Sequence, residues 1–242
     1  MCGIAGMASL TPLDKEDWAD VMRLWHMLSM RGMDGSGLAW LTDKEIRLTK
    51  TASPSVLRTN ANYISTYPLM RSVILHCRAA TIGRASADNA HPFTFPGVTG
   101  VHNGTIRKLA KFGKTDSEAL YELISNKGIE EVWKDLDGAA ALAYFNHATY
   151  ENMTLHLIRN RQRPMFYLRA YNRLVFASEP WMLGLFSLKE PFARRKKCIP
   201  EALQPHHLMT VKWGKHELNV SYKPLDHKDD RKPEIVTHVW PT

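Results

Sequence analysis

The chain has few cysteines, no long apolar run and no internal repeat. Three of its 242 residues are cysteine, and their spacing fits neither a disulfide framework nor a zinc site. No segment reaches the roughly 18 consecutive apolar residues of a membrane-spanning helix, and the N-terminus lacks the basic and apolar regions of a secretory signal. We therefore expect a cytoplasmic protein with no membrane partner and no metal site.

The composition is that of a globular protein with a basic surface. Hydrophobic residues make up 44% and charged residues 23%, with a net charge of +8. The periodic patterns stop after Pro224, which predicts one domain over 1–224 and a tail over 225–242. A basic run at 194–197 leaves nucleic-acid binding open, but no nucleic-acid-binding motif accompanies it, so a solvated loop is the favoured interpretation.

Alternating apolar residues and short polar turns predict mostly antiparallel strands. One helix is expected from the N-cap Asp14 to Arg31–Gly32, and a second helical zone over 117–136 with a break at Gly128. We predict an α+β fold with helices on the outer faces of stacked antiparallel sheets. The expected strands are 3–7, 37–41, 46–49, 73–77, 98–102, 141–145, 155–158, 166–168 and 174–177, with a closing hairpin of 208–213 and 218–222.

Cys2 is placed where removal of Met1 would make it the N-terminal residue. Its free α-amine, with a pKa of about 7.7–8, would then lie beside the thiol and could take its proton. Position alone favours a different interpretation, in which Cys2 is a small buried hydrophobic residue.

The tripeptide His102-Asn103-Gly104 lies at the end of a predicted strand. A side-chain amide next to a glycine N–H can donate two hydrogen bonds to an oxyanion, which is a large term in acyl-transfer catalysis. Asn-Gly is also a common hairpin turn, so the tripeptide alone favours a structural role.

Two charged residues are candidates for binding a substrate. Arg78 follows an apolar strand, and a guanidinium can hold a carboxylate through two hydrogen bonds. Asp116 could hold an ammonium group, although Asp116 or Ser117 as the cap of the next helix would explain this segment equally well.

The order and spacing of these segments resemble the class II glutamine amidotransferases of the N-terminal nucleophile hydrolase superfamily. The likeness extends over about residues 2–224. The segments that carry it are Cys2–Gly6, Arg31–Gly37, His76–Arg78, Asn89–Pro92, His102–Gly104 and Asp116–Glu118.

The resemblance implies a fold, a reaction and a set of residues. The implied fold is a four-layer αββα sandwich, and the implied reaction is hydrolysis of glutamine to glutamate and ammonia through a thioester, without metal or cofactor. Cys2 would be nucleophile and base, and Asn103 and Gly104 would form the oxyanion hole. The substrate-binding residues that it implies are Arg78, Thr81, His91 and Asp116.

The chain differs from the family pattern in one motif and in length. Many members have Arg-Trp-Ala-Thr-His-Gly where this chain has Ala79 and Ile82 in place of Trp and His. Because most relatives also carry a domain that consumes the ammonia, we expect a separate synthetase or transferase as the acceptor. The alternatives are a stand-alone γ-glutamyl amide hydrolase and a catalytically idle sandwich that binds protein or nucleic acid. The oligomeric state is left open.

Overall fold

The computed structural model describes residues 2–53, 69–80, 84–111, 115–149, 152–187 and 199–228. Within this part of the chain, the strands form two antiparallel sheets. The first sheet has the order β11-β9-β10-β1-β4-β2-β3, and the second has the order β13-β12-β8-β7-β6-β5.

The strands of the first sheet are β1 (Gly3–Ser9), β2 (Gly35–Leu41), β3 (Ile46–Thr51), β4 (Ser72–Arg78), β9 (Phe166–Arg169), β10 (Arg173–Ala177) and β11 (Glu201–Ala202). Those of the second are β5 (Phe93–Phe95), β6 (Val98–Thr105), β7 (Ala139–Asn146), β8 (Thr154–Arg159), β12 (His207–Trp213) and β13 (Leu218–Pro224).

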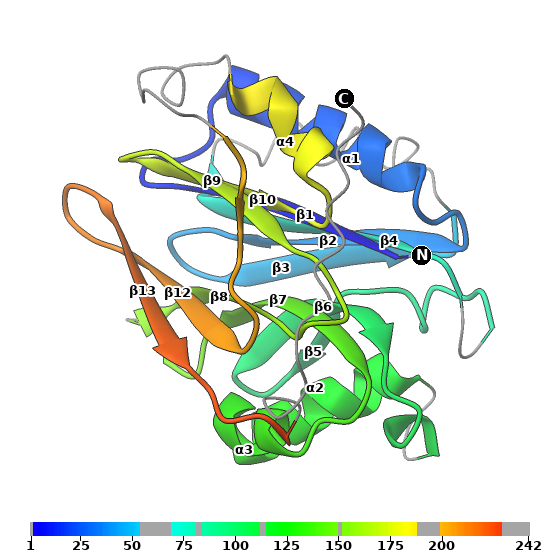
Figure 1. The fold of residues 1–242 in the computed structure, drawn as a ribbon. Coiled ribbons are helices and arrows are strands. Elements are labelled where there is room, and N and C mark those ends of the chain that lie inside the picture. Colours follow the sequence, from blue (N-terminus) through cyan, green and yellow to red (C-terminus); the bar gives the residue numbers. More distant parts are fainter. Residues whose placement is uncertain are drawn as a thin grey trace, which may run out of the picture.

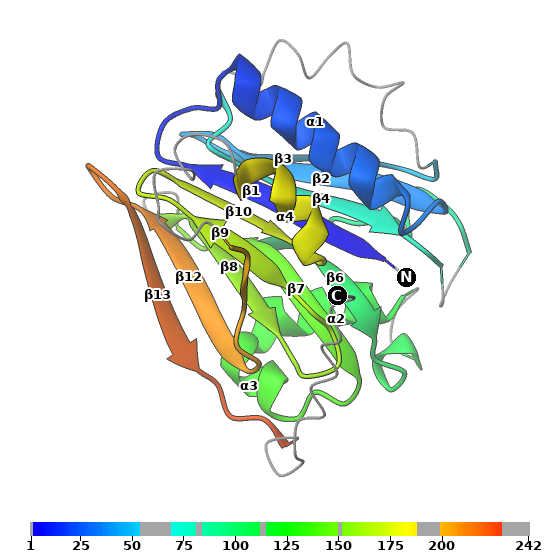
Figure 2. The same cartoon turned by 45° about the horizontal axis from the view of Figure 1, so that its top comes forward.

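Helices cover the outer face of each sheet, which gives four layers (Figure 1). Helices α1 (Lys15–Ser29) and α4 (Pro180–Ser187) lie on the first sheet, and Figure 2 shows both on the same face. Helices α2 (Asp116–Lys127) and α3 (Ile129–Lys134) lie on the second. The predicted αββα sandwich is confirmed.

Strand β1 shows why its sequence requires this layered arrangement. Every residue of β1 is buried, and alternate side chains point to opposite faces of a strand. Ala5 and Met7 pack under α1, whereas Ile4 and Ala8 pack between the two sheets. A strand that is apolar on both faces needs a layer on each side, so β1 lies in the middle of its sheet.

Helix α1 begins where the sequence predicts. The Asp14 carboxylate accepts hydrogen bonds from the backbone N–H groups of Glu16 and Asp17, and the Asp17 carboxylate accepts one from the Asp14 N–H. This reciprocal capping satisfies N–H groups that the first turn leaves without partners. The helix ends at Ser29, two residues before the predicted end.

The second helical zone is broken at Gly128, as predicted, but its cap is different. Thr115 is the N-cap of α2, and its hydroxyl accepts a hydrogen bond from the Glu118 N–H at 3.1 Å. Neither Asp116 nor Ser117 has this role. Asp116 is the first helical residue, and its carboxylate accepts a hydrogen bond from the Ile106 N–H at 2.7 Å.

The chain continues to pack beyond the end of β13. Leu225 is 5% exposed and lies in the core under α3. The His227 ring stacks on the His206 ring with centroids 4.2 Å apart. The domain boundary at 224 stays a prediction, and residues 229–242 of the predicted tail lie outside the described residues. Among the helices of the described residues, none has the length and apolar character needed to cross a bilayer.

Candidate active site

Cys2 lies directly before β1, in the middle of the first sheet. Gly3 pairs with Cys77 on the neighbouring strand β4, so Cys2 lies beside the end of β4, where Arg78 and Ala79 follow. The Ala79 N–H donates a hydrogen bond to the Cys2 sulfur at 3.3 Å, and the thiol lies 3.4 Å from the Ala79 carbonyl oxygen. The sulfur is therefore held against the backbone next to Arg78.

The surroundings of the Cys2 thiol act on its pKa in opposite directions. Burial raises the pKa above its ordinary value, whereas the hydrogen bond from Ala79 and the positive charge of Arg78 lower it. The negative charge of Asp116 raises it again. The net effect is a raised pKa, so the thiol is neutral at pH 7 and needs a base before it can attack.

The turn after α1 fixes the position of Arg78. The Arg78 carbonyl accepts a hydrogen bond from the Asp34 N–H at 2.9 Å, and the Asp34 carboxylate accepts one from the Ala80 N–H at 2.7 Å. At Gly32, a Cβ atom would lie 2.4 Å from the carbonyl carbon of Arg78. The absence of a side chain at Gly32 thus allows the two segments to approach this closely.

Asn103 and Gly104 lie inside strand β6 and pair with Ala141 and Ala140. They therefore do not form the hairpin turn that was the structural alternative. The side-chain nitrogen of Asn103 is buried and has no hydrogen-bond partner among the described residues. At Gly104, a Cβ atom would lie 1.8 Å from the Ala139 carbonyl oxygen, so this position accepts only glycine.

Three buried histidines lie around these residues: His76 and His91 contact each other next to the end of β4, whereas the His102 side chain points to the face of β6 that α2 covers. The His76 Nε2 lies 3.2 Å from the His102 carbonyl oxygen, which links β4 to β6 immediately before Asn103. The His91 ring lies 3.9 Å from the His76 ring. The His102 ring contacts the Ser117 hydroxyl at 2.9 Å and the Ala139 carbonyl at 3.3 Å.

Burial keeps these histidines neutral. It lowers the pKa of His76 to about 3 and that of His91 well below its usual value, and it also lowers the pKa of His102. Both ring nitrogens of His91 are buried and lack a hydrogen-bond partner in the described part of the protein. Neutral rings at this depth support the strands around the site without adding charge to it.

Some of the predicted residues lie outside the described part of the chain. Thr81, which the sequence analysis assigned to substrate binding, lies outside the described residues, as do Met1, Cys198 and the basic run 194–197. Cys77 is fully buried, as its place in an apolar strand predicts. Within the described residues, no group of three or more His, Cys, Asp and Glu side chains is arranged to bind a metal ion.

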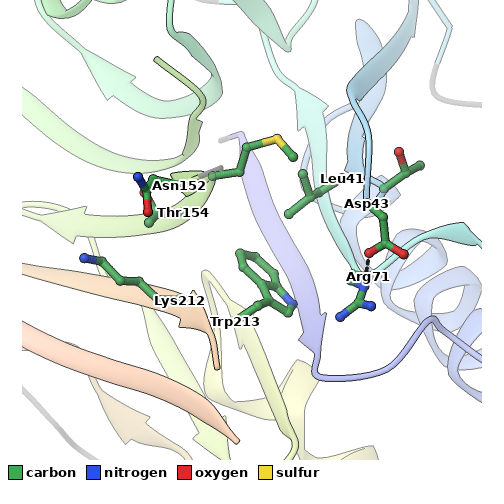
Figure 3. A pocket seen from close by; sticks show the side chains of 9 residues that line it. Leu41, Asp43, Arg71, Asn152, Thr154, Lys212 and Trp213 are labelled. Atoms are coloured by element: carbon green, nitrogen blue, oxygen red, sulfur yellow. Dashed lines mark ion pairs between the residues drawn. The ribbon is translucent and has the colours of Figure 1, made fainter. Parts of the chain in front are cut away.

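Figure 3 shows the side chains that line a cavity of about 220 Å³ between the sheets. It lies at the start of β4, the end opposite Cys2. It is lined in part by Arg71, Thr154 and Trp213. The polar groups of these residues already have partners: Arg71 pairs with Asp43, the Thr154 hydroxyl contacts His156, and the Trp213 indole N–H donates to the Ser9 carbonyl. This cavity is distant from the nucleophile and does not define the candidate site.

Comparison with known proteins decides the family. A family model described as "Glutamine amidotransferases class-II" matches residues 1–144, which is more than half of the chain. The chain belongs to the class II glutamine amidotransferase family. The match includes Cys2, Arg78, Asn103, Gly104 and Asp116, so every placed catalytic candidate lies inside it.

Curated relatives of this amidotransferase chain are longer proteins. It is 28% identical over 165 residues to a glutamine–fructose-6-phosphate aminotransferase (isomerizing) of Rhizobium leguminosarum bv. viciae, a match that covers 59% of the chain and 26% of the relative. A protein of the same name from Helicobacter pylori is 27% identical over 193 residues, covering 72% of the chain and 30% of the relative. The chain thus spans about a quarter of the length of these relatives.

Solved structures show the same fold. A glutamine phosphoribosylpyrophosphate amidotransferase from B. subtilis aligns with a TM-score of 0.64 at 17% identity, covering 91% of this chain and 49% of that one. A glutamine aminotransferase class-II domain protein from Silicibacter pomeroyi aligns with a TM-score of 0.52 at 16% identity, covering 93% and 99%. Both solved structures therefore have the same sandwich fold as this chain.

The backbone and ion-pair contacts that hold the site of this amidotransferase together were not predicted from the sequence. Ala79 donates its bond through the backbone, which no side-chain pattern reveals. Arg31 lies inside a matching segment but was given no role, and its partner Glu179 is 148 residues away. These two residues meet because α1 packs on β1 and β1 pairs with β10.

Proposed function

We propose that the chain hydrolyses glutamine to glutamate and ammonia through a γ-glutamyl thioester on Cys2. The observation that carries the proposal is the contact of the Cys2 sulfur with the Ala79 N–H, because it holds the nucleophile beside Arg78. Cysteine attack on a carboxamide next to a fixed guanidinium fits an amide substrate that also bears a carboxylate.

The base in this proposal is the α-amine of Cys2. The raised pKa of the buried thiol leaves it protonated at neutral pH. An α-amine with a pKa of about 7.7–8 is partly neutral there and can accept the thiol proton. This amine exists only after Met1 has been removed, so we expect the chain that retains Met1 to be inactive.

The substrate is held at its charged end in this proposal. Arg78 binds the α-carboxylate of glutamine and Asp116 binds its α-ammonium group, and both act electrostatically on the Cys2 thiol. We also assign substrate binding to Thr81 and His91, and the unpartnered ring nitrogens of His91 support its part. Opposite charges at two fixed points select an α-amino acid over a simple amide.

The chemical steps follow from these positions. The thiolate attacks the γ-carbonyl carbon, and the resulting oxyanion accepts hydrogen bonds from the Asn103 amide and the Gly104 N–H. The protonated α-amine returns its proton to the leaving nitrogen, the carbon–nitrogen bond breaks, and ammonia departs. Water then attacks the thioester, the carbon–sulfur bond breaks, and glutamate leaves with the thiol restored.

The ammonia passes, in this proposal, to a separate synthetase or transferase. The relatives named above are aminotransferases in which the matched part is about a quarter of the protein. A pull-down from the native source with mass spectrometry tests this part. Recovery of an ammonia-consuming enzyme supports it, and a partner set without one counts against it.

Glutamate release from a chain that starts at Cys2 tests the hydrolysis. Such a chain is obtained from a cleavable fusion, and Cys2→Ala should abolish its activity. Cys198→Ser is the matched control, because it removes a thiol that has no part in the proposal. Hydroxylamine should trap the thioester as a hydroxamate. Equal glutamate release by the wild-type chain and Cys2→Ala would sink the proposal.

A further inference from the structure

Helix α1 is tied to strand β10 by an ion pair at each end. Near the start of the helix, Asp17 pairs with Arg173, the first residue of β10, with N–O distances of 2.7 and 2.5 Å. Beyond the other end, Arg31 pairs with Glu179, two residues after β10. The arginine side chains are similarly buried, at 14% and 12% exposed. Only the second pair touches the nucleophile.

Arg31 bridges Glu179 and the backbone of Cys2. Its Nη1 contacts the Glu179 carboxylate, while its Nε donates a hydrogen bond to the Cys2 carbonyl oxygen at 3.1 Å. A guanidinium presents these N–H groups in one rigid plane. The carboxylate that binds one edge of Arg31 therefore fixes the direction of the N–H that meets Cys2.

Glu179 is itself held in place by the strand that follows Cys2. The N–H of its neighbour Ser178 donates to the Ile4 carbonyl at 2.8 Å, and the Ser178 hydroxyl accepts from the Ile4 N–H at 2.9 Å. A Cβ atom at Gly3 would lie 3.1 Å from the Arg31 side chain, so Arg31 lies directly against the backbone between Cys2 and Ile4. These contacts close a ring around residues 2–4.

We propose that Glu179, acting through Arg31, is a positioning residue for Cys2. The bond to the carbonyl fixes the peptide plane between Cys2 and Gly3, and with it the directions of the thiol and the α-nitrogen. This inference rests on the proposed function, because orientation matters to catalysis only if Cys2 is the nucleophile. Glu179 lies beyond residues 1–144, so the family match does not assign it.

A positioning role for Glu179 predicts a change in the turnover rate and little change in substrate affinity. Arg31 touches the nucleophile's backbone and Glu179 touches Arg31, whereas neither is among the proposed substrate contacts Arg78, Asp116, Thr81 and His91. Misplacing a reacting group by about 1 Å can cost about 100-fold in rate. We therefore expect Glu179→Ala to lower kcat by about 10- to 100-fold with KM changed less than about threefold. Glu179→Gln keeps an acceptor for Arg31 and should recover part of the rate.

A charge-swapped double variant separates an effect on the orientation of Cys2 from an effect on the stability of the fold. In Arg31→Glu/Glu179→Arg, the ion pair can re-form, but a carboxylate at position 31 cannot donate to the Cys2 carbonyl. We expect the melting temperature to recover towards that of the wild type while kcat stays low. Arg173→Gln is the matched control, because it breaks the ion pair at the far end and should lower the melting temperature without lowering kcat.

The experiment uses the chain that starts at Cys2 and measures kcat, KM, melting temperature and the rate of Cys2 alkylation by iodoacetamide. Recovery of kcat in the charge-swapped chain, or unchanged kcat in Glu179→Ala, would overturn the proposal. If the wild-type chain releases no glutamate, the proposed function is wrong, but the positioning role of Glu179 can still be tested. The alkylation rate then decides the positioning: a changed rate at Cys2 in Glu179→Ala but not in Arg173→Gln supports it, and an unchanged rate rejects it.

Discussion

The amide of Asn103 shows a conflict between stability and function at the scale of one residue. Its nitrogen is buried without an acceptor among the described residues, and a buried unpaired donor costs about 1–3 kcal/mol. Such a donor is useful if an oxyanion forms in front of it during the reaction. The unpaired amide thus destabilises the folded chain, and a hydrogen bond to the oxyanion in the transition state would relieve this destabilisation.

We expect Asn103→Ala to change activity and stability in opposite directions. Loss of one oxyanion donor should lower kcat by about 100- to 1,000-fold, whereas removal of the unpaired group should leave the melting temperature equal or higher. Steady-state glutaminase kinetics and a thermal melt on the same preparation check both. A large fall in melting temperature with kcat preserved would show that the amide is structural.

The sequence predicts some residues of the site and not others, for a physical reason. Cys2, Arg78, Asn103 and Asp116 can be singled out because each carries its chemistry in its own side chain. The Glu179–Arg31 bond depends on two distant segments meeting across a sheet, which no local pattern encodes.

The first turn of α1 allows a test at the scale of one element. Asp14→Ala removes the acceptor for the Glu16 and Asp17 N–H groups, and loss of an N-cap costs about 1 kcal/mol. We expect the melting temperature to fall by about 2–4 °C, with kcat unchanged because the cap lies at the end of α1 away from Arg31.

Glu16→Ala is the control for this measurement, since Glu16 takes part in the cap through its backbone N–H. It should leave the melting temperature nearly unchanged. A fall in kcat in Asp14→Ala that exceeds the effect of lost stability would mean that the start of α1 influences the nucleophile, contrary to the arrangement described here.

Strands of four or more residues bounded by turns were predictable, whereas very short strands and a short apolar helix were not. The strand-forming segments predicted between residues 3 and 222 are all present, because alternating or continuous apolar runs bounded by short turns specify them. Helix α4 was missed because its sequence PWMLGLFS is apolar almost throughout and shows no polar face. Strands β5 and β11, with three and two residues, are too short to show a period.

Buried neutral histidines determine how the whole molecule responds to acid. Burial lowers the pKa of His76 to about 3 and that of His156 to about 4, whereas an unfolded histidine titrates near pH 6.5. Below pH 6.5 the unfolded chain therefore binds protons that the folded chain does not, so stability falls as the pH falls.

Between pH 7.5 and pH 5 each such histidine should remove about 2 kcal/mol from the free energy of unfolding. Urea unfolding at pH 7.5, 6.5, 5.5 and 5.0 measures this, and the carboxylates contribute little in that window. His156→Gln, which is distant from Cys2, should reduce the pH dependence of the unfolding free energy by the contribution of one histidine. Equal unfolding free energies at pH 7.5 and pH 5.0 would contradict the prediction.

The position of β1 has a consequence for how the protein folds. This strand comes first in the sequence, yet its two neighbours are β4, which begins at Ser72, and β10, which begins at Arg173. Contacts between such distant segments close large loops and form slowly. Until residue 177 has joined the sheet, β1 lacks a neighbour on one side. We therefore expect Cys2 to acquire its ordered surroundings late, so its reactivity reports complete assembly of the sheet.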